Sequence, residues 1–124
     1  MAVPILKQGD VLIASIQVAL SDLDLVELRD ALAAQVGRFR SRGVIIDVTA
    51  LDVLDSFATR TLRSIAYTTR LRGASTVIVG IQPDVAFAMV QLGLALEGVT
   101  TALDLEDGLA QLGNAVDHGG VRGR

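Results

Sequence analysis

A short β-branched run in the middle of the chain, Val44-Ile45-Ile46, constrains the fold more than any other feature. A continuous apolar run of this kind is typical of a strand that is buried on both faces, and such strands occur in parallel sheets covered by helices. A second run with the same pattern extends from Ser75 to Ile81. The two runs together predict an α/β fold with a mostly parallel central sheet.

A helical pattern precedes the first of these strands. Apolar residues recur at steps of three and four between Leu25 and Phe39, which indicates one apolar face of a helix. Ser21, with an acidic residue three positions later, predicts a capping box at its start. We expect this helix to run to about Arg42 and to end at Gly43, because glycine is common just after the last helical residue.

The rest of the chain alternates in the same way. The complete predicted order is β-β-α-β-α-β-α-β-α, which corresponds to one α/β domain over residues 1–117 and a disordered, Gly-rich tail over residues 118–124. The first two strands, over Val3–Leu6 and Val11–Ile16, are predicted to form an N-terminal hairpin. Three further helices are predicted: one from Ser56 to Gly73, one from Pro83 to Gly93, and one that begins at Asp104. An edge strand is predicted over Val99–Leu103. The last helix carries an apolar stripe at Leu105, Leu109, Leu112 and Val116.

Composition and charge exclude several classes of function. The 124 residues carry a net charge of −3 without a basic cluster, so we expect no binding to nucleic acid. The alternating Arg38, Arg40 and Arg42 are interpreted as a solvated helix end. The absence of cysteine fits a reducing compartment, and no signal peptide or membrane-spanning run of roughly 20 apolar residues is present. We therefore predict a cytoplasmic protein that does not enter a membrane.

Catalytic patterns are missing as well. The single histidine, His118, lies in the predicted tail, so a Ser-His-Asp triad would lack its base. Neither a phosphate-binding Gly-rich loop nor a metal-ligand cluster occurs, and Asp52 and Asp55 are common turn formers. Asp47 invites comparison with phosphoacceptor receiver domains, but the only lysine is Lys7. We predict that the protein is not an enzyme and that it binds no cofactor or metal.

Ser56 is the remaining position with usable chemistry. It is predicted to be the N-cap of the second helix, and this capping role alone would account for a serine there. A phosphate at a helix start is also stabilised by the exposed amides and by the helix dipole, and it would add charge beside Asp52 and Asp55. The two roles are compatible, because an N-cap serine is partly exposed.

These residues carry a resemblance to a known family. The segment Asp47-Val48-Thr49, followed by Leu54-Asp55-Ser56, resembles the central motif of STAS domains, the family of anti-sigma-factor antagonists. The predicted element order is also the STAS order, and the similarity covers residues 3 to about 116. Further matches resemble the branch of single-domain stressosome scaffolds; they lie at Leu71–Ala74, Val77–Pro83, Leu92-Gly93 and Ala102–Leu109.

The resemblance implies a phosphorylation switch. Ser56 would be phosphorylated by a GHKL-type serine/threonine switch kinase, which the unmodified protein sequesters and the phosphorylated protein releases. A PP2C-type phosphatase would reset the site, and larger STAS-bearing sensor paralogues would join this chain in a large self-associating scaffold for stress signalling. The sensor paralogues carry a second regulatory position at the start of the first helix, which falls here on Asp22, with Ser21 beside it. The surface expected to meet partners consists of Asp52, Asp55, Ser56, Phe57, Thr59 and Arg60.

Two other functions stay open for a STAS domain of this kind. One is a simple anti-sigma-factor antagonist that binds a single anti-sigma kinase and forms no large assembly. The other is a module that binds a small molecule or a nucleotide, although no phosphate loop favours it. A plain α/β module in which Ser56 is only a helix cap is the alternative without a switch.

Overall fold

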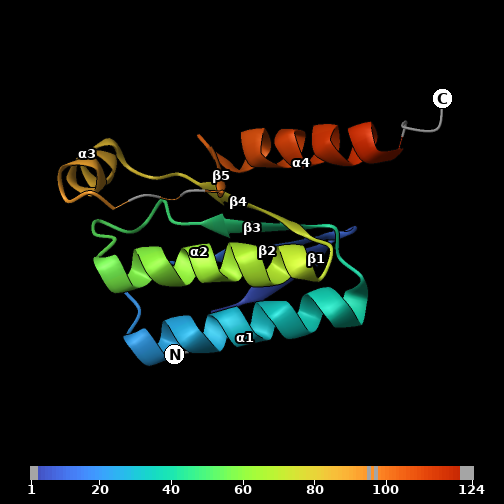
Figure 1. The fold of residues 1–124 in the computed structure, drawn as a ribbon, viewed down its shortest axis with the longest axis horizontal. Coiled ribbons are helices and arrows are strands. Elements are labelled where there is room, and N and C mark those ends of the chain that lie inside the picture. The colour runs from blue at the N-terminus through green and yellow to red at the C-terminus, as the bar shows by residue number, and fades with distance from the viewer. Residues whose placement is uncertain (1–2, 95, 97, 121–124) are drawn as a thin grey trace.

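The computed structural model describes residues 3–94, 96 and 98–120, with side chains through residue 113 (Figure 1). Within these residues the elements follow the predicted order. The predicted α/β fold and its element order are therefore confirmed. The elements are β1 (Ile5–Gln8), β2 (Val11–Ser15), α1 (Asp22–Phe39), β3 (Gly43–Asp47), α2 (Ser56–Leu71), β4 (Ser75–Val79), α3 (Pro83–Gln91), β5 (Thr100–Ala102) and α4 (Leu105–Gly120).

The strands form one sheet in the order β1-β2-β3-β4-β5. β1 and β2 are antiparallel and form the predicted hairpin, whose turn places Gly9 at φ 61, in the left-handed region that favours glycine. The pairs β2–β3, β3–β4 and β4–β5 are all parallel. The central strand is thus the predicted run around Ile45, and β5 lies at the predicted sheet edge.

Helices cover both faces of the sheet. α1 and α2 lie side by side on one face, and α4 lies on the other (Figure 1). Val44 and Ile46 of β3 pack in the core cluster with α1 and α2, whereas Ile45 between them packs in the cluster of Leu112 from α4. This alternation explains why every residue of the run is apolar.

The end of α1 differs from the prediction. The helix stops at Phe39, and Arg40 takes the left-handed conformation at its C-cap with φ 51. Gly43 does not end the helix but begins β3, where an added Cβ would lie 2.8 Å from Leu112 Cδ1. The glycine therefore reflects close packing of α4 rather than a helix cap. Phe39 leaves the apolar face of the helix and is 38% exposed.

The last helix is longer than the sequence predicts. Asp104 caps α4 as predicted, since its Oδ1 accepts a hydrogen bond from the Asp107 N–H at 2.8 Å. α4 then continues to Gly120 and so includes residues 118–120, which the sequence places in a disordered tail. Glycine lowers helix propensity without preventing helical geometry, and no proline interrupts this segment. The remaining tail residues, 121–124, and the side chain of Val116 lie outside the described residues.

None of the helices in the described part of the chain is long and apolar enough to cross a membrane.

Candidate functional site

The start of α2 places a capping residue and a free hydroxyl next to each other. Asp55 is the N-cap, with extended backbone, and its Oδ1 accepts a hydrogen bond from the Ala58 N–H at 2.8 Å. Ser56 is the first helical residue, so the prediction that Ser56 caps α2 is wrong by one position. Asp and Ser are comparable capping residues, and here the carboxylate one residue earlier satisfies the orphan amide.

The Ser56 side chain is consequently exposed and unused. Its hydroxyl forms no hydrogen bond with any residue that the structure describes. A reaction at this oxygen would break no contact within the described residues. The exposed amides of the first helical turn lie close to it and favour an anionic group there.

The connection that carries this site is fixed by hydrogen bonds. After β3, Asp47 Oδ1 accepts from the Thr49 N–H at 2.9 Å and from the Thr49 hydroxyl at 2.6 Å. The Thr49 carbonyl in turn accepts from Gln82 Nε2 at 2.6 Å, which ties the connection to the start of α3. Leu51 and Leu54 of this segment are buried and pack in the core. The acidic side chains between and after them are therefore turned outward.

Four of the six residues predicted to meet partners are exposed, namely Asp52, Asp55, Ser56 and Arg60. Phe57 is half-buried. Thr59 is only 1% exposed, and its hydroxyl donates to the Asp55 carbonyl at 2.9 Å. Placing Thr59 on the surface is therefore wrong, because the turn of the helix that begins at Asp55 directs this side chain into the core.

An apolar feature that the sequence did not predict lies at the same place. Val53 is 73% exposed although its neighbours Leu51 and Leu54 are buried. It borders an apolar pocket of about 130 Å³ between the starts of α1 and α2. The acidic surface around Ser56 therefore also offers apolar contacts. The available signal in the sequence was Val53, an apolar residue in a connection that also contains Asp52 and Asp55. The pocket is lined by Ile16, Ala19, Leu20, Leu25, Leu51, Val53, Leu54, Asp55, Ala58 and Leu62.

The start of α1 has the opposite order of the same two residue types. Ser21 is the N-cap, and the predicted capping box with Asp24 is present: the Asp24 N–H donates to Ser21 Oγ at 3.1 Å, and the Ser21 N–H donates to Asp24 Oδ2 at 3.2 Å. Asp22 is the first helical residue and is exposed. The α1 start thus presents a carboxylate at the position where the α2 start presents the Ser56 hydroxyl.

Nothing in the described part of the chain forms a metal site, since no three side chains of His, Cys, Asp or Glu gather there. Asp47, the residue that invited comparison with receiver domains, holds Thr49.

The fold and this helix start define a class of protein. The family model for the STAS domain matches residues 2–108, and the chain belongs to that family. Within the family it is similar to stressosome proteins, which confirms the resemblance seen in the sequence. One similar structure is a variant of RsbS from Moorella thermoacetica in which one serine is replaced by glutamate. It is 36% identical to this chain with a TM-score of 0.80, and the match covers 93% of this chain and 97% of that one.

Two further comparisons point the same way. A solved chain described under the molecular architecture of the stressosome, a signal integration and transduction hub, is 37% identical with a TM-score of 0.77, over 91% of this chain and 98% of that one. RsbRA of Bacillus subtilis, a protein named an RsbT co-antagonist, is 34% identical over 60% of this chain and 27% of its own length. The chain thus spans a third or less of the first curated relatives that it matches.

Proposed function

We propose that this protein is a non-enzymatic stressosome scaffold that sequesters a serine/threonine switch kinase of the GHKL type and releases it when Ser56 is phosphorylated. The family and the stressosome relatives support the scaffold role. The name of RsbRA, an RsbT co-antagonist, supports a role in antagonising a regulatory partner.

One observation carries the proposal: Ser56 is exposed and its hydroxyl is free of the capping role, which Asp55 performs. The capping hydrogen bond runs from the Ala58 N–H to Asp55 Oδ1, so it does not involve the oxygen that would be phosphorylated. At the first helical position the phosphate adds its charge without removing the cap. The modification therefore acts on binding and leaves the domain folded.

Electrostatics provide the release step. A phosphoserine carries about −1.5 to −2 charges at neutral pH. At Ser56 this charge would stand beside the exposed carboxylates of Asp52 and Asp55. The first-turn amides of α2 stabilise it within the domain, whereas a kinase seated on this surface meets new negative charge and new bulk. The kinase then dissociates.

The other partners follow from the same scheme. Larger STAS-bearing sensor paralogues would assemble with this chain through their STAS domains. RsbRA is a longer relative, since this chain matches 27% of its length. A PP2C-type phosphatase would remove the phosphate and restore kinase binding. Asp22 would serve as a fixed negative charge at the second regulatory position, and Ser21, whose Oγ already caps α1, would stay unmodified.

Binding of the cognate kinase to charge variants tests the proposal. We expect Ser56→Asp to weaken kinase binding by at least about tenfold, which corresponds to roughly 1.4 kcal/mol. Ser56→Ala should bind as the wild type does. Ser64→Asp, a change of the same kind two turns further along α2, is the matched control and should also bind normally. Titration calorimetry measures the affinities, and thermal unfolding shows whether each variant is folded.

Two results would contradict the proposal. One is a Ser56→Asp variant that is folded and binds the kinase with wild-type affinity. The other is a loss of binding that follows a fall in melting temperature rather than the charge at Ser56.

A further inference from the structure

Arg60 is an exposed cation one helical turn after Ser56. Ser56 is the first residue of α2, so the two residues stand at positions i and i+4 of one continuous helix. Side chains at this spacing lie on the same face of a helix, with about 5–6 Å between their Cβ atoms. The two residues are therefore neighbours on the surface at the start of α2.

The usual direction of helical side chains favours contact between Arg60 and a group on Ser56. In a helix the Cα–Cβ bond tilts toward the N-terminus, and long side chains take rotamers that lie over the preceding turn. The turn that precedes Arg60 is the one that begins at Ser56. The guanidinium is thus directed toward the place where a phosphate on Ser56 would lie.

Arg60 has no partner among the side chains that the structure describes. It forms no ion pair, hydrogen bond or ring contact with them. Helix α2 contains no aspartate or glutamate, and the exposed Asp52 and Asp55 just before the helix are not paired with Arg60. The helix dipole favours cations in the last turn, so it does not account for a cation near the start. The charge of Arg60 is available for a new partner.

The start of α1 lacks this arrangement. Asp22, the first residue of α1, occupies the position that Ser56 has in α2. The residue four positions after Asp22 is Val26, which carries no charge. A cation at i+4 therefore accompanies the serine, which can be modified, and does not accompany the fixed carboxylate.

We propose that Arg60 binds the phosphate when Ser56 is phosphorylated and holds it along α2. This inference rests on the function proposed above, because it concerns the modified form of the same serine. Phosphorylation replaces the hydroxyl proton of Ser56 by a phosphoryl group that is largely dianionic at neutral pH. Arginine pairs with phosphate through two parallel, charge-assisted hydrogen bonds. An anion at i with a cation at i+4 is also the more favourable order of the two charges along a helix.

The pair changes what the start of α2 presents to a partner. Before modification, the exposed carboxylates of Asp52 and Asp55 are accompanied by one unpaired cation, Arg60. After modification, the phosphate occupies this cation and adds negative charge of its own. A kinase at this surface loses an available cation and meets an anion at the same place, so one modification removes an attraction and adds a repulsion.

Phosphoserine placed at position 56 during synthesis of the full chain tests the inference without a kinase. Phosphorus-31 NMR at a series of pH values measures the second pKa of the phosphate, which is about 6 in an ordinary phosphoserine. A nearby cation stabilises the dianion and lowers this pKa. Arg60→Gln should therefore raise the pKa by at least about 0.3, which is a twofold change in the proton dissociation constant.

The carboxylates at the starts of α1 and α2 have the opposite effect, because like charges raise the pKa of the phosphate. They are present in every variant, so their effect cancels when variants are compared. These carboxylates are Asp22 and Asp24 at the start of α1, and Asp52 and Asp55 before α2.

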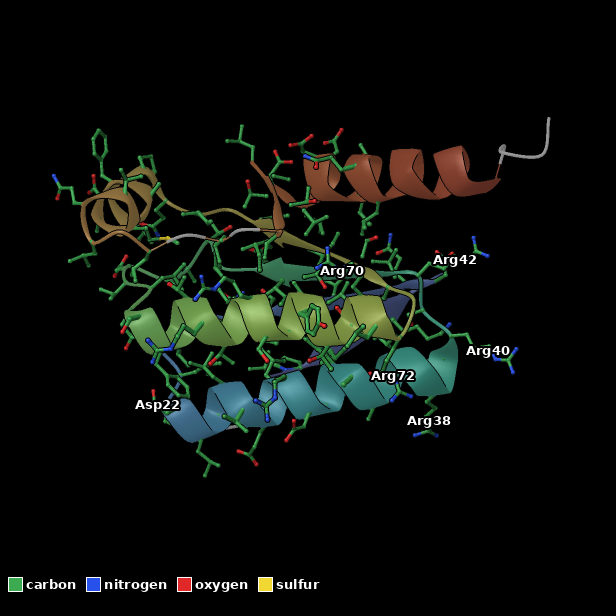
Figure 2. All side chains as sticks on the ribbon, viewed as in Figure 1. Asp22, Arg38, Arg40, Arg42, Arg70 and Arg72 are labelled. Carbon is green, nitrogen blue, oxygen red and sulfur yellow. The ribbon has the colours of Figure 1, made fainter. Side chains whose placement is uncertain are left out.

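Two further variants separate a local charge pair from a general effect of charge. Arg60→Lys keeps the cation and should restore most of the lowering of the pKa. Arg70→Gln is the matched control, because Arg70 is an exposed arginine near the end of the same helix (Figure 2). It lies about 21 Å along the helix from Ser56 at 1.5 Å per residue, which is beyond the screening length at physiological salt. Its replacement should leave the pKa within about 0.1 of the wild-type value.

Thermal unfolding gives a second readout, and a merely structural role of Arg60 would not change it. Each chain is measured with serine and with phosphoserine at position 56. The change in melting temperature on phosphorylation should be more favourable in the wild type than in Arg60→Gln by about 1–2 °C. The unmodified form of Arg60→Gln shows that the variant is folded.

The inference is overturned if the phosphate has the same pKa in the wild type and in Arg60→Gln, if Arg70→Gln raises it as much, or if Arg60→Lys behaves as Arg60→Gln does. A kinase that leaves Ser56 unmodified would instead contradict the proposed function. Since the phosphoserine is introduced without the kinase, the two failures are distinguishable.

Discussion

At the residue scale, the start of α2 assigns helix capping and the free hydroxyl to two adjacent residues, although one serine could have supplied both. Asp55 accepts the Ala58 N–H, and Ser56 keeps a free hydroxyl one position later. Alanine substitutions at the two residues should therefore have different effects on the free energy of unfolding.

Asp55→Ala removes the cap of α2. We expect it to lower the free energy of unfolding by about 1 kcal/mol, because the Ala58 amide loses its partner. Ser56→Ala removes an exposed hydroxyl without a hydrogen bond and should change stability by less than about 0.5 kcal/mol. Urea unfolding followed by circular dichroism measures both.

Asp52→Ala is the control for Asp55→Ala, since Asp52 is an exposed acid whose side chain forms no hydrogen bond with the described residues. It should resemble Ser56→Ala. A larger loss in Ser56→Ala than in Asp55→Ala would mean that the serine caps the helix after all.

The sequence located the start of α2 to within one residue, but it could not show which residue caps the helix and which keeps a free hydroxyl. Asp55 and Ser56 are adjacent residues with similar capping ability, and only the backbone geometry decides which side chain reaches Ala58. The burial of Thr59 did have a signal in the sequence, because Thr59 lies three residues before Leu62 and seven before Ala66 and therefore shares the apolar face of this helix. The exposed position predicted for it is in fact part of the core.

At the element scale, the connection between β3 and α2 depends on how closely it packs against the end of β4. Gly80 follows β4 with φ 82, and an added Cβ would lie 1.9 Å from Thr49 Oγ1. Thr49 is the residue that Asp47 and Gln82 hold. The absence of a side chain at Gly80 thus allows the geometry of the connection that carries Ser56.

Gly80→Ala should therefore destabilise the domain by roughly 2–3 kcal/mol, through backbone strain together with the clash. Gly73→Ala is the matched control, because Gly73 also has positive φ but an added Cβ there meets nothing within 4 Å. We expect it to cost about 1–2 kcal/mol, from strain alone. Equal costs in chemical denaturation would show that the contact with Thr49 has no effect.

Docking of α4 on the second face of the sheet makes another prediction. Leu112 is 2% exposed and packs with Ile13, Ile45, Val77 and Val79. Leu112→Ala should lower the free energy of unfolding by about 2–5 kcal/mol, whereas Leu105→Ala, at a residue 37% exposed, should cost less than half as much. Thermal unfolding compares the two, and similar losses would contradict the packing described for α4.

Element order was predictable because hydrophobic periodicity and helix caps agree along the chain. The residues at which the elements begin and end were less predictable. Gly43 looks like a helix stop, but it is needed where Leu112 approaches β3, and this contact between residues distant in sequence leaves no local signal. The left-handed Arg40 that ends α1 likewise has no signature in the sequence.

At the scale of the whole molecule, the parallel sheet gives the domain a polarity. The helices that follow β2, β3 and β4 begin at one end of the domain, where Asp22 lies. α1 and α2 run toward the other end, where Arg38, Arg40 and Arg42 lie (Figure 2). In the sequence, Arg38, Arg40 and Arg42 read as a solvated helix end. The chain alone could not reveal that Lys7 and Arg72 join them, because β1 and α2 meet α1 only in the folded domain.

The central claim is that Ser56 is the switch, and its most direct test is phosphorylation by the cognate kinase. The protein is incubated with this kinase and ATP, and intact mass and peptide mapping then locate the product. Our account predicts one added phosphate, on Ser56, which is absent from a folded Ser56→Ala variant and present in Ser64→Ala. Phosphate at another residue, or an unmodified wild type, would contradict it.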